Sequence, residues 1–196
     1  MTDTRERFLD AATAAFAERG FYGTSIATIV ETLPFTKQAL LHHFGSKEKL
    51  YGEVLKRISD RLRREVNLAV ENRDDPRERL ETTLLDILDS AMAHDADTML
   101  LMRELLDNKR RAGAARAWYL KPFLELLTDM VQSVPASGFP SRHAALSFVY
   151  QMLGAINYFV VSEPTLTQMY GKRDFMKLRE CYAQELKRLI SARLED

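Results

Sequence analysis

Two short helical patterns with a tight break between them occupy residues 24–50, and this stretch constrains the fold more than any other part of the chain. The first pattern begins at Thr24 or Ser25, since either side chain can cap a helix. Pro34 ends it, because the residue before a proline is pushed out of the helical region, and Thr36 can cap the second pattern. Apolar residues recur at the spacing of one helical face, namely Ile26, Ile29 and Val30 and then Leu40, Leu41 and Phe44. The stretch therefore predicts a helix-turn-helix.

The second helix of this pair carries residue types that suit nucleic acid. Beside its apolar face it has cationic, amide-bearing, small and imidazole side chains: Lys37, Gln38, Ala39, His42 and His43. Such groups can contact phosphates and the edges of bases. We therefore expect residues 36–43 to form a recognition helix that enters the major groove of double-stranded DNA.

Charge is distributed unevenly along the chain. The 28 basic residues balance 28 acidic ones, and a neutral total counts mildly against a nucleic-acid role. Residues 36–64, however, hold eight basic and three acidic residues. Because attraction at a surface is screened beyond about 8 Å in physiological salt, this local excess matters more than the total.

The remainder of the chain also has helical patterns. Only 8 glycines and 6 prolines occur among 196 residues, which favours a helix-rich protein. Gly20 is expected to end the first helix, and Pro122 predicts a kink or a second helix start. Helical spacing covers residues 4–19, 47–72, 76–94, 96–109, 116–133, 141–162 and 174–193, with loops expected at 135–140 and 163–172. We therefore predict an all-α fold of about nine helices.

We expect two domains joined by a long helix. Residues 1–50 would form a three-helix DNA-binding domain that contains the helix-turn-helix. Residues 51–196 would form a helical bundle for ligand binding and dimerisation. The helix over 47–72 would be about 38 Å long at 1.5 Å per residue, which is enough to run from one module to the next.

Several classes of protein are disfavoured. Cys181 is the single cysteine, which excludes an intramolecular disulfide. The chain shows no charged-then-apolar leader and no run of 18 apolar residues, so we expect a cytoplasmic protein without a membrane span. It has no nucleophile elbow, zinc-protease motif or Cys-x-x-Cys pair, and His94 with Asp97 supplies only two possible metal ligands. We therefore expect no enzyme activity, no metal and no cofactor.

Residues 7–55 resemble the tetracycline-repressor (TetR-like) family of bacterial transcription regulators. The resemblance lies in the order and spacing of a few motifs: Phe8-Leu9-Asp10-Ala11-Ala12, Phe16, Gly20-Phe21, Thr24-Ser25-Ile26, Ile29, Leu40, His43-Phe44 and Ser46-Lys47-Glu48-Lys49-Leu50. Beyond residue 60 only the all-helical layout matches. The resemblance implies a DNA-binding transcriptional repressor with an effector pocket and a dimer interface in its C-terminal part.

The resemblance also implies roles for individual residues. Thr24 and Thr36 would bind phosphates at helix N-termini, where free N–H groups and the helix dipole favour anions. Lys37, Gln38, Ala39 and His42 would face the major groove, and His43 and Lys47 would grip the DNA backbone. The full set expected at the DNA is Thr24, Ser25, Thr36, Lys37, Gln38, Ala39, Leu41, His42, His43 and Lys47.

Three positions depart from the family pattern. The turn has Leu33-Pro34-Phe35-Thr36 where a glycine is usual, and proline cannot take the positive φ that glycine allows. Leu41 replaces a tyrosine that often reaches a phosphate. Gln38 replaces a small residue, so it adds either a polar reader or a steric block. These departures bear on which operator is preferred.

Aromatic and methionine side chains between residues 92 and 159 have two interpretations. They can be ordinary bundle core, or they can line a pocket for a small-molecule effector, which a regulator needs. The residues expected at such a pocket are Met102, Trp118, Tyr119, Phe123 and Tyr158.

The helices over 141–162 and 174–193 are more apolar than surface helices need to be. Gly154 and Ala155 would allow close approach of another helix. We therefore expect a homodimer that presents two recognition helices to a palindromic operator. The residues expected in its interface are Leu146, Val149, Leu153, Ile156, Phe175, Leu178, Tyr182 and Leu186.

One alternative from another class stays open. Because of Pro34 and Leu41, the chain could be a helical protein–protein adaptor that has lost sequence-specific DNA reading. Recovery of a palindrome by selection from random duplexes would separate the two hypotheses.

Overall fold

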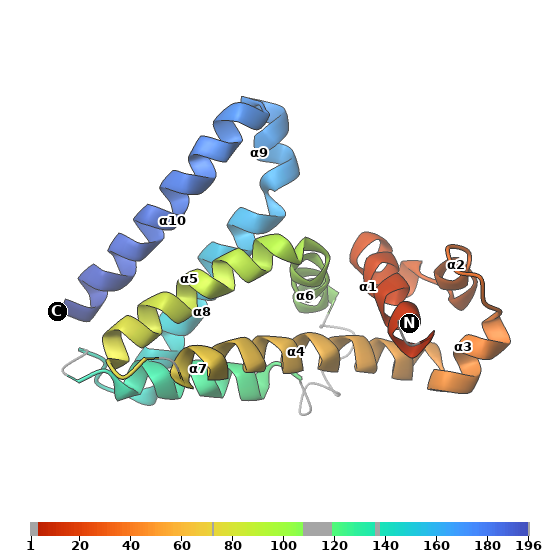
Figure 1. The fold of residues 1–196 in the computed structure, drawn as a ribbon, viewed down its shortest axis with the longest axis horizontal. Coiled ribbons are helices and arrows are strands. Elements are labelled where there is room, and N and C mark those ends of the chain that lie inside the picture. The colour runs from red at the N-terminus through yellow and green to blue at the C-terminus, as the bar shows by residue number, and fades with distance from the viewer. Residues whose placement is uncertain (1–3, 72, 108–118, 136–137, 196) are drawn as a thin grey trace. The chain divides into compact units, whose positions relative to one another are not determined.

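The computed structural model describes residues 4–71, 73–107, 119–135 and 138–195. These residues form ten helices and no strand, which confirms the all-α prediction. The helices are α1 (Thr4–Gly23), α2 (Ile26–Val30), α3 (Lys37–Phe44), α4 (Lys47–Glu71), α5 (Pro76–Ala93), α6 (Asp95–Asp107), α7 (Lys121–Ser133), α8 (Arg142–Val161), α9 (Glu163–Tyr170) and α10 (Lys172–Glu195) (Figure 1).

The chain divides into two compact units. The first unit comprises residues up to 60 together with 96–119, and the second comprises 61–95 together with 120–196. The helix α4 is continuous across residue 60, so it belongs to both. The domain division expected at residue 50 is a functional one and stays a proposal.

The core of the first unit is built by α1, α2, α3 and the start of α4. Large apolar side chains from each of these helices are fully buried: Phe8, Leu9, Phe16, Ile29, Leu40 and Leu50. Gly20 ends the regular part of α1, as expected, because its φ of 71° lies in the left-handed region that glycine tolerates. The chain then turns through Phe21, which packs against Phe16 and Tyr51.

The helix α6 also belongs to the first unit. The guanidinium of Arg103 donates hydrogen bonds to the carbonyl oxygens of Ala17 (2.6 Å) and Glu18 (2.9 Å). The hydroxyl of Tyr51 donates to the buried carboxylate of Glu104 at 2.6 Å. Two adjacent residues of α6 are therefore bonded to α1 and α4.

The second unit is a bundle in which α5 packs against α7, α8 and α10, and α7 packs closely along α8. Its fully buried side chains include Leu80, Leu84, Leu88, Leu127 and Ile190. The helix α7 begins at Lys121 with Pro122 in its first turn, which confirms a second helix start at this proline.

The loop expected over 163–172 is wrong, because most of it is α9. Pro164 lies in the first turn of this helix, where proline is favoured, and Gly171 ends it with a φ of 82°. Both residues, a proline that favours a helix start and a glycine that favours a helix end, could have predicted this helix from the sequence.

Among the described helices, α8 is the one long and apolar enough to cross a membrane by length and composition alone. It packs against α5 and α7, and Phe148, Val149 and Ile156 are buried there. These residues of α8 therefore belong to the core of the second unit.

Candidate nucleic-acid interface

Both helices of the predicted helix-turn-helix begin at capped residues. The Ser25 hydroxyl accepts a hydrogen bond from the N–H of Thr28 at 3.1 Å, which identifies Ser25, not Thr24, as the cap of α2. The Thr36 hydroxyl accepts from the N–H of Ala39 at 3.1 Å and caps α3. Each cap pairs an N–H that would otherwise have no partner within its helix.

The inner face of α3 is fixed by burial. Leu40 and Phe44 are buried, and the Phe44 ring lies edge-on to Phe8 of α1. On α2, Ile29 and Val30 are buried as well. Since residues three and four apart share one helical face, burial of this face leaves the opposite face of α3 outward.

The turn without a glycine is anchored by an aromatic side chain. The ring centre of Phe35 lies 5.1 Å from that of Phe8. The guanidinium of Arg7 lies 5.0 Å from the centre of the Phe35 ring. Aromatic and cation–π contacts of this kind stabilise a specific geometry. Phe35 thus attaches the turn to α1, a role that the sequence did not reveal.

The outer face of α3 is exposed and polar. Lys37, Gln38, His42 and His43 are exposed, and Leu41 is 40% exposed, whereas Ala39 is half-buried. His43 also packs against the Phe8 ring at 5.6 Å. Of the residues expected to face the major groove, Lys37, Gln38 and His42 are therefore exposed on α3, whereas Ala39 is partly covered.

Thr24 is placed differently from the expectation. Its side chain is buried, and its hydroxyl donates within the chain toward the carbonyl oxygens of Gly20 (2.8 Å) and Ala15 (3.0 Å). A hydroxyl engaged in this way holds the end of α1 and is not presented to a phosphate. Ser25 and Thr36 are exposed, so their surroundings are open to a ligand.

Lys47 is also engaged inside the protein. Its ammonium donates to the carbonyl oxygens of Phe21 (2.9 Å) and Thr24 (3.0 Å) and lies 4.3 Å from the centre of the Phe21 ring. The ammonium of Lys47 is therefore bonded within the protein, whereas the resemblance implies that it contacts the DNA backbone.

The start of α4 carries a carboxylate that stays ionised. The backbone N–H of Glu48 and then the hydroxyl of Ser46 bond to the Glu48 carboxylate and lower its pKa, and the charge of Lys47 adds a smaller effect in the same direction. Ser46 also accepts a hydrogen bond from the N–H of Lys49 at 3.2 Å. A negative charge here suits the N-terminus of a helix.

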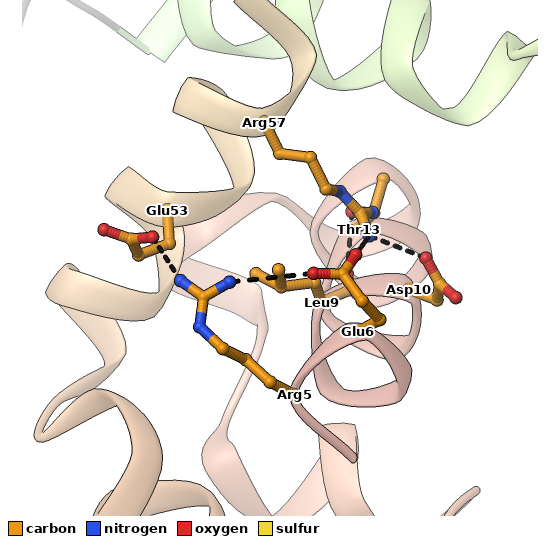
Figure 2. Close-up of polar contacts among 7 residues, drawn as sticks. All are labelled: Arg5, Glu6, Leu9, Asp10, Thr13, Glu53 and Arg57. Carbon is orange, nitrogen blue, oxygen red and sulfur yellow. Dashed lines mark hydrogen bonds and ion pairs between the residues drawn. The ribbon is translucent and has the colours of Figure 1, made fainter. Parts of the chain in front are cut away.

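A polar network joins α1 to α4, as Figure 2 shows. The guanidinium of Arg57 donates to Asp10 (2.7 Å), Thr13 (2.9 Å) and Glu6 (3.4 Å). Beside it, Arg5 of α1 pairs with Glu53 of α4. Nothing in the sequence pattern singled out these residues, because their partners lie more than 40 positions away.

The residues expected at an effector pocket lie in different surroundings. Phe123 is buried in the second unit, whereas Tyr158 of that unit is 72% exposed. Met102 is half-buried in the first unit, and the Tyr119 hydroxyl there lies only 2.8 Å from where a Cβ on Gly52 would stand. Trp118 lies outside the described residues.

The residues expected in a dimer interface are split between core and surface. Val149, Ile156, Phe175 and Leu186 are buried within the second unit itself, so they have little surface for a second subunit. Leu146, Leu153 and Tyr182 are half-buried, and Leu178 is exposed. The Tyr182 ring is stacked on Phe159 at 3.8 Å between ring centres. Other apolar side chains on α8 and α10 are more exposed, notably Tyr150, Tyr158 and Leu189.

Known DNA-binding regulators resemble this chain in sequence. A family model described as bacterial regulatory proteins, tetR family, matches residues 8–54. The HTH-type transcriptional repressor KstR2 of Mycobacterium tuberculosis is 29% identical over 178 residues, which cover 86% of this chain and 88% of that protein. The HTH-type transcriptional activator FasR of Mycolicibacterium smegmatis is 31% identical over 102 residues, covering 52% of this chain and 46% of FasR.

The fold has solved counterparts. The structure of a putative fatty acid metabolism regulator from Clostridium perfringens matches with a TM-score of 0.77 at 16% identity, over 94% of this chain and 96% of that one. The match supports the arrangement of an N-terminal helix-turn-helix followed by further helices.

Proposed function

We propose that the chain is a member of the TetR family of bacterial transcriptional regulators, which are DNA-binding proteins and not enzymes. In this role it binds a palindromic operator as a homodimer and leaves it when a small molecule binds its C-terminal helices. The observation that carries the proposal is the exposed face of α3. There Lys37, Gln38 and His42 face outward, while Leu40 and Phe44 hold the opposite face in the core.

Side-chain chemistry supports major-groove reading at this face. A lysine can donate to the acceptors of guanine, and a glutamine can bond adenine through both of its amide atoms. Leu41 has no hydrogen-bonding group, so it offers apolar contact where a tyrosine would offer a donor. The N-terminus of α3 favours a phosphate near Thr36, because N–H groups there point outward.

Repression is the sign of regulation that the relatives favour. KstR2, which aligns with most of this chain, is named a repressor. FasR, named an activator, aligns with about half of it. A regulator that blocks a promoter needs only tight, specific DNA binding, which this fold can supply.

Exposed residues of α8 and α10 support a dimer. Tyr150, Gly154 and Tyr158 are exposed at intervals of four residues along α8, and the space around a Cβ at Gly154 is open. On α10, Leu189 is 61% exposed. We place a symmetry-related subunit against this face, in place of the buried Val149 and Ile156. A two-fold axis would then present two α3 helices one DNA turn apart, about 34–36 Å.

Effector binding would be coupled to DNA binding through α4. This helix runs without a break from Lys47, beside the reading helices, to Glu71 in the second unit. A shift of its C-terminal part would change the separation of the two α3 helices in the dimer. Coupling free energies between such sites are typically about 1–3 kcal/mol.

Selection of bound sequences from random duplexes tests the proposal. The expected result is one palindrome, bound with a steep negative dependence of log affinity on log salt concentration. Failure to enrich any sequence, together with isolation of a stable protein partner, would favour the adaptor hypothesis. Loss of the selected complex on adding a cell extract's small molecules would then support the effector step.

A further inference from the structure

We infer that Lys47 acts in DNA binding as a positioning residue that holds the reading helices from inside the protein, and that its ammonium does not contact DNA. This inference rests on the proposed DNA binding. It opposes the role that the family resemblance implies for a lysine at this position. The geometry around its Nζ atom carries the argument.

The ammonium of Lys47 has strong partners within the chain. It donates to the Phe21 carbonyl at 2.9 Å and to the Thr24 carbonyl at 3.0 Å, which uses two of its three hydrogens. The Phe21 ring covers it from a further direction, with 4.3 Å between Nζ and the ring centre. These contacts are charge-assisted hydrogen bonds and a cation–π contact, so moving the ammonium to a phosphate would leave two carbonyl oxygens and the Phe21 ring without their cation.

The two carbonyls lie where the chain leaves one helix and enters the next. Gly20 interrupts α1 with a φ of 71°, Phe21 lies in the short helical stretch after this kink, and Thr24 directly precedes Ser25, the cap of α2. Carbonyl oxygens that follow a helix end attract cations. Lys47 therefore secures the connection between α1 and α2.

The same side chain is attached directly after α3. Gly45, with a φ of 79°, ends α3, and α4 begins at Lys47. One ammonium thus joins the segment before α2 to the segment after α3. Both helices of the reading motif are fixed at this point, so its loss would let α3 tilt relative to α2 without removing any group from the DNA surface.

Salt dependence separates a positioning residue from a phosphate contact. Removing a phosphate contact reduces the slope of log affinity against log salt by about one, because one fewer counterion is released. Removing an internal support weakens binding by a similar factor at every salt concentration. The Lys47→Met variant retains the length and apolar stem of the side chain but has no donor.

The experiment compares Lys47→Met with Lys37→Met and Arg57→Met on the selected duplex between about 50 and 200 mM salt. Lys37 is exposed on α3, and Arg57 bonds only to α1 in the network of Figure 2. We expect Lys47→Met to weaken binding about 10- to 100-fold with an unchanged slope and a lowered Tm, as Arg57→Met should. Lys37→Met should reduce the slope by about one with an unchanged Tm. Lys47→Arg, which keeps the donors, should recover most of the affinity.

A slope reduced by about one in Lys47→Met, with an unchanged Tm, would overturn the inference. If this variant does not fold, chemical methylation of lysines in the wild-type protein decides the matter. Lys47 should be protected both without and with DNA, whereas Lys37 should become protected only with DNA. Protection of Lys47 that appears only with DNA would also overturn the inference. If the wild-type protein binds no duplex at all, the proposed function fails instead.

Discussion

The Arg103 guanidinium of α6 donates to the carbonyl oxygen of Ala17 in α1 across a distance of 2.6 Å, although the two residues are 86 positions apart in the chain. A second nitrogen of the same group donates to the Glu18 carbonyl at 2.9 Å. These carbonyls belong to the last turn of α1 before its kink at Gly20, and carbonyls near a helix end are commonly bonded by side chains. Arg103 therefore completes the C-terminus of α1 from another helix.

Replacing Arg103 with Met should lower the free energy of unfolding by about 1–3 kcal/mol, because two carbonyls lose a charged donor. Urea denaturation of both proteins measures the difference. Arg188→Met is a matched control, since Arg188 is exposed and its ion pair among the described residues is with Glu185 on its own helix. The effect of this variant should stay within about 0.5 kcal/mol. Equal effects of the two variants would contradict the role assigned to Arg103.

Local signals in the sequence were sufficient to find the reading motif. A serine or threonine before an apolar repeat predicts a cap by short-range hydrogen bonding alone, and both Ser25 and Thr36 are caps. The outward set on α3 followed from the 3.6-residue period once Leu40 and Phe44 were assigned to the core.

Contacts between segments far apart in the chain could not be predicted from local sequence patterns. The partners of Lys47, Arg57 and Arg103 depend on how α1, α4 and α6 pack, and no spacing rule records that packing. The dimer face illustrates the same limit. The apolar period on α8 identified Val149 and Ile156, but only the tertiary structure shows that this stripe faces the chain's own core.

Gln38 should determine which bases are read. It is exposed on α3 next to Lys37, and its amide can both donate to and accept from adenine. We expect Gln38→Ala to lose about 1–3 kcal/mol on the preferred duplex and much less on duplexes changed at the contacted base pair. Affinities for a set of single-substitution duplexes measure this. A uniform loss across all of them would contradict a reading role.

Tyr158 should lie in the subunit interface. Its side chain is 72% exposed on α8, on the same face as the exposed Tyr150 and Gly154. We expect Tyr158→Glu to convert the dimer to monomers in sedimentation experiments, because a carboxylate would be buried without a partner. Tyr170→Glu is the control, since Tyr170 is 58% exposed but lies at the end of α9. A Tyr158→Glu protein that stays dimeric would place the interface elsewhere.

Gly20 should resist substitution because of its backbone conformation. A φ of 71° with a ψ of 174° lies in a region that residues with a Cβ avoid. We expect Gly20→Ala to cost about 1–3 kcal/mol of stability, and to weaken DNA binding because Thr24 and Lys47 are anchored next to this break. Gly154→Ala, in a regular helix with open space around the Cβ, should be neutral or stabilising for the monomer.

Two carboxylates of α5 should make opposite contributions to the pH dependence of stability. Burial raises the pKa of Asp86 by more than the charge of Arg73 lowers it, and the charges of Asp89 and Glu65 add smaller upward effects. Burial also acts to raise the pKa of Glu81, but hydrogen bonds from Lys187 and Ser191 outweigh it and lower that pKa overall. The ionised form is thus disfavoured by folding at Asp86 and favoured at Glu81.

These shifts fix the direction of each variant's effect. The cost at Asp86 is absent below the ordinary pKa of an aspartate and is fully present above its raised pKa, so Asp86→Asn should stabilise the protein at pH 7. The gain at Glu81 is present at neutral pH and is lost as the pH falls through its lowered pKa, so Glu81→Gln should destabilise at pH 7. Both differences should shrink toward zero when urea unfolding is repeated at successively lower pH. A stabilising effect of Asp86→Asn that persists below pH of about 3 would show that its origin is not the charge.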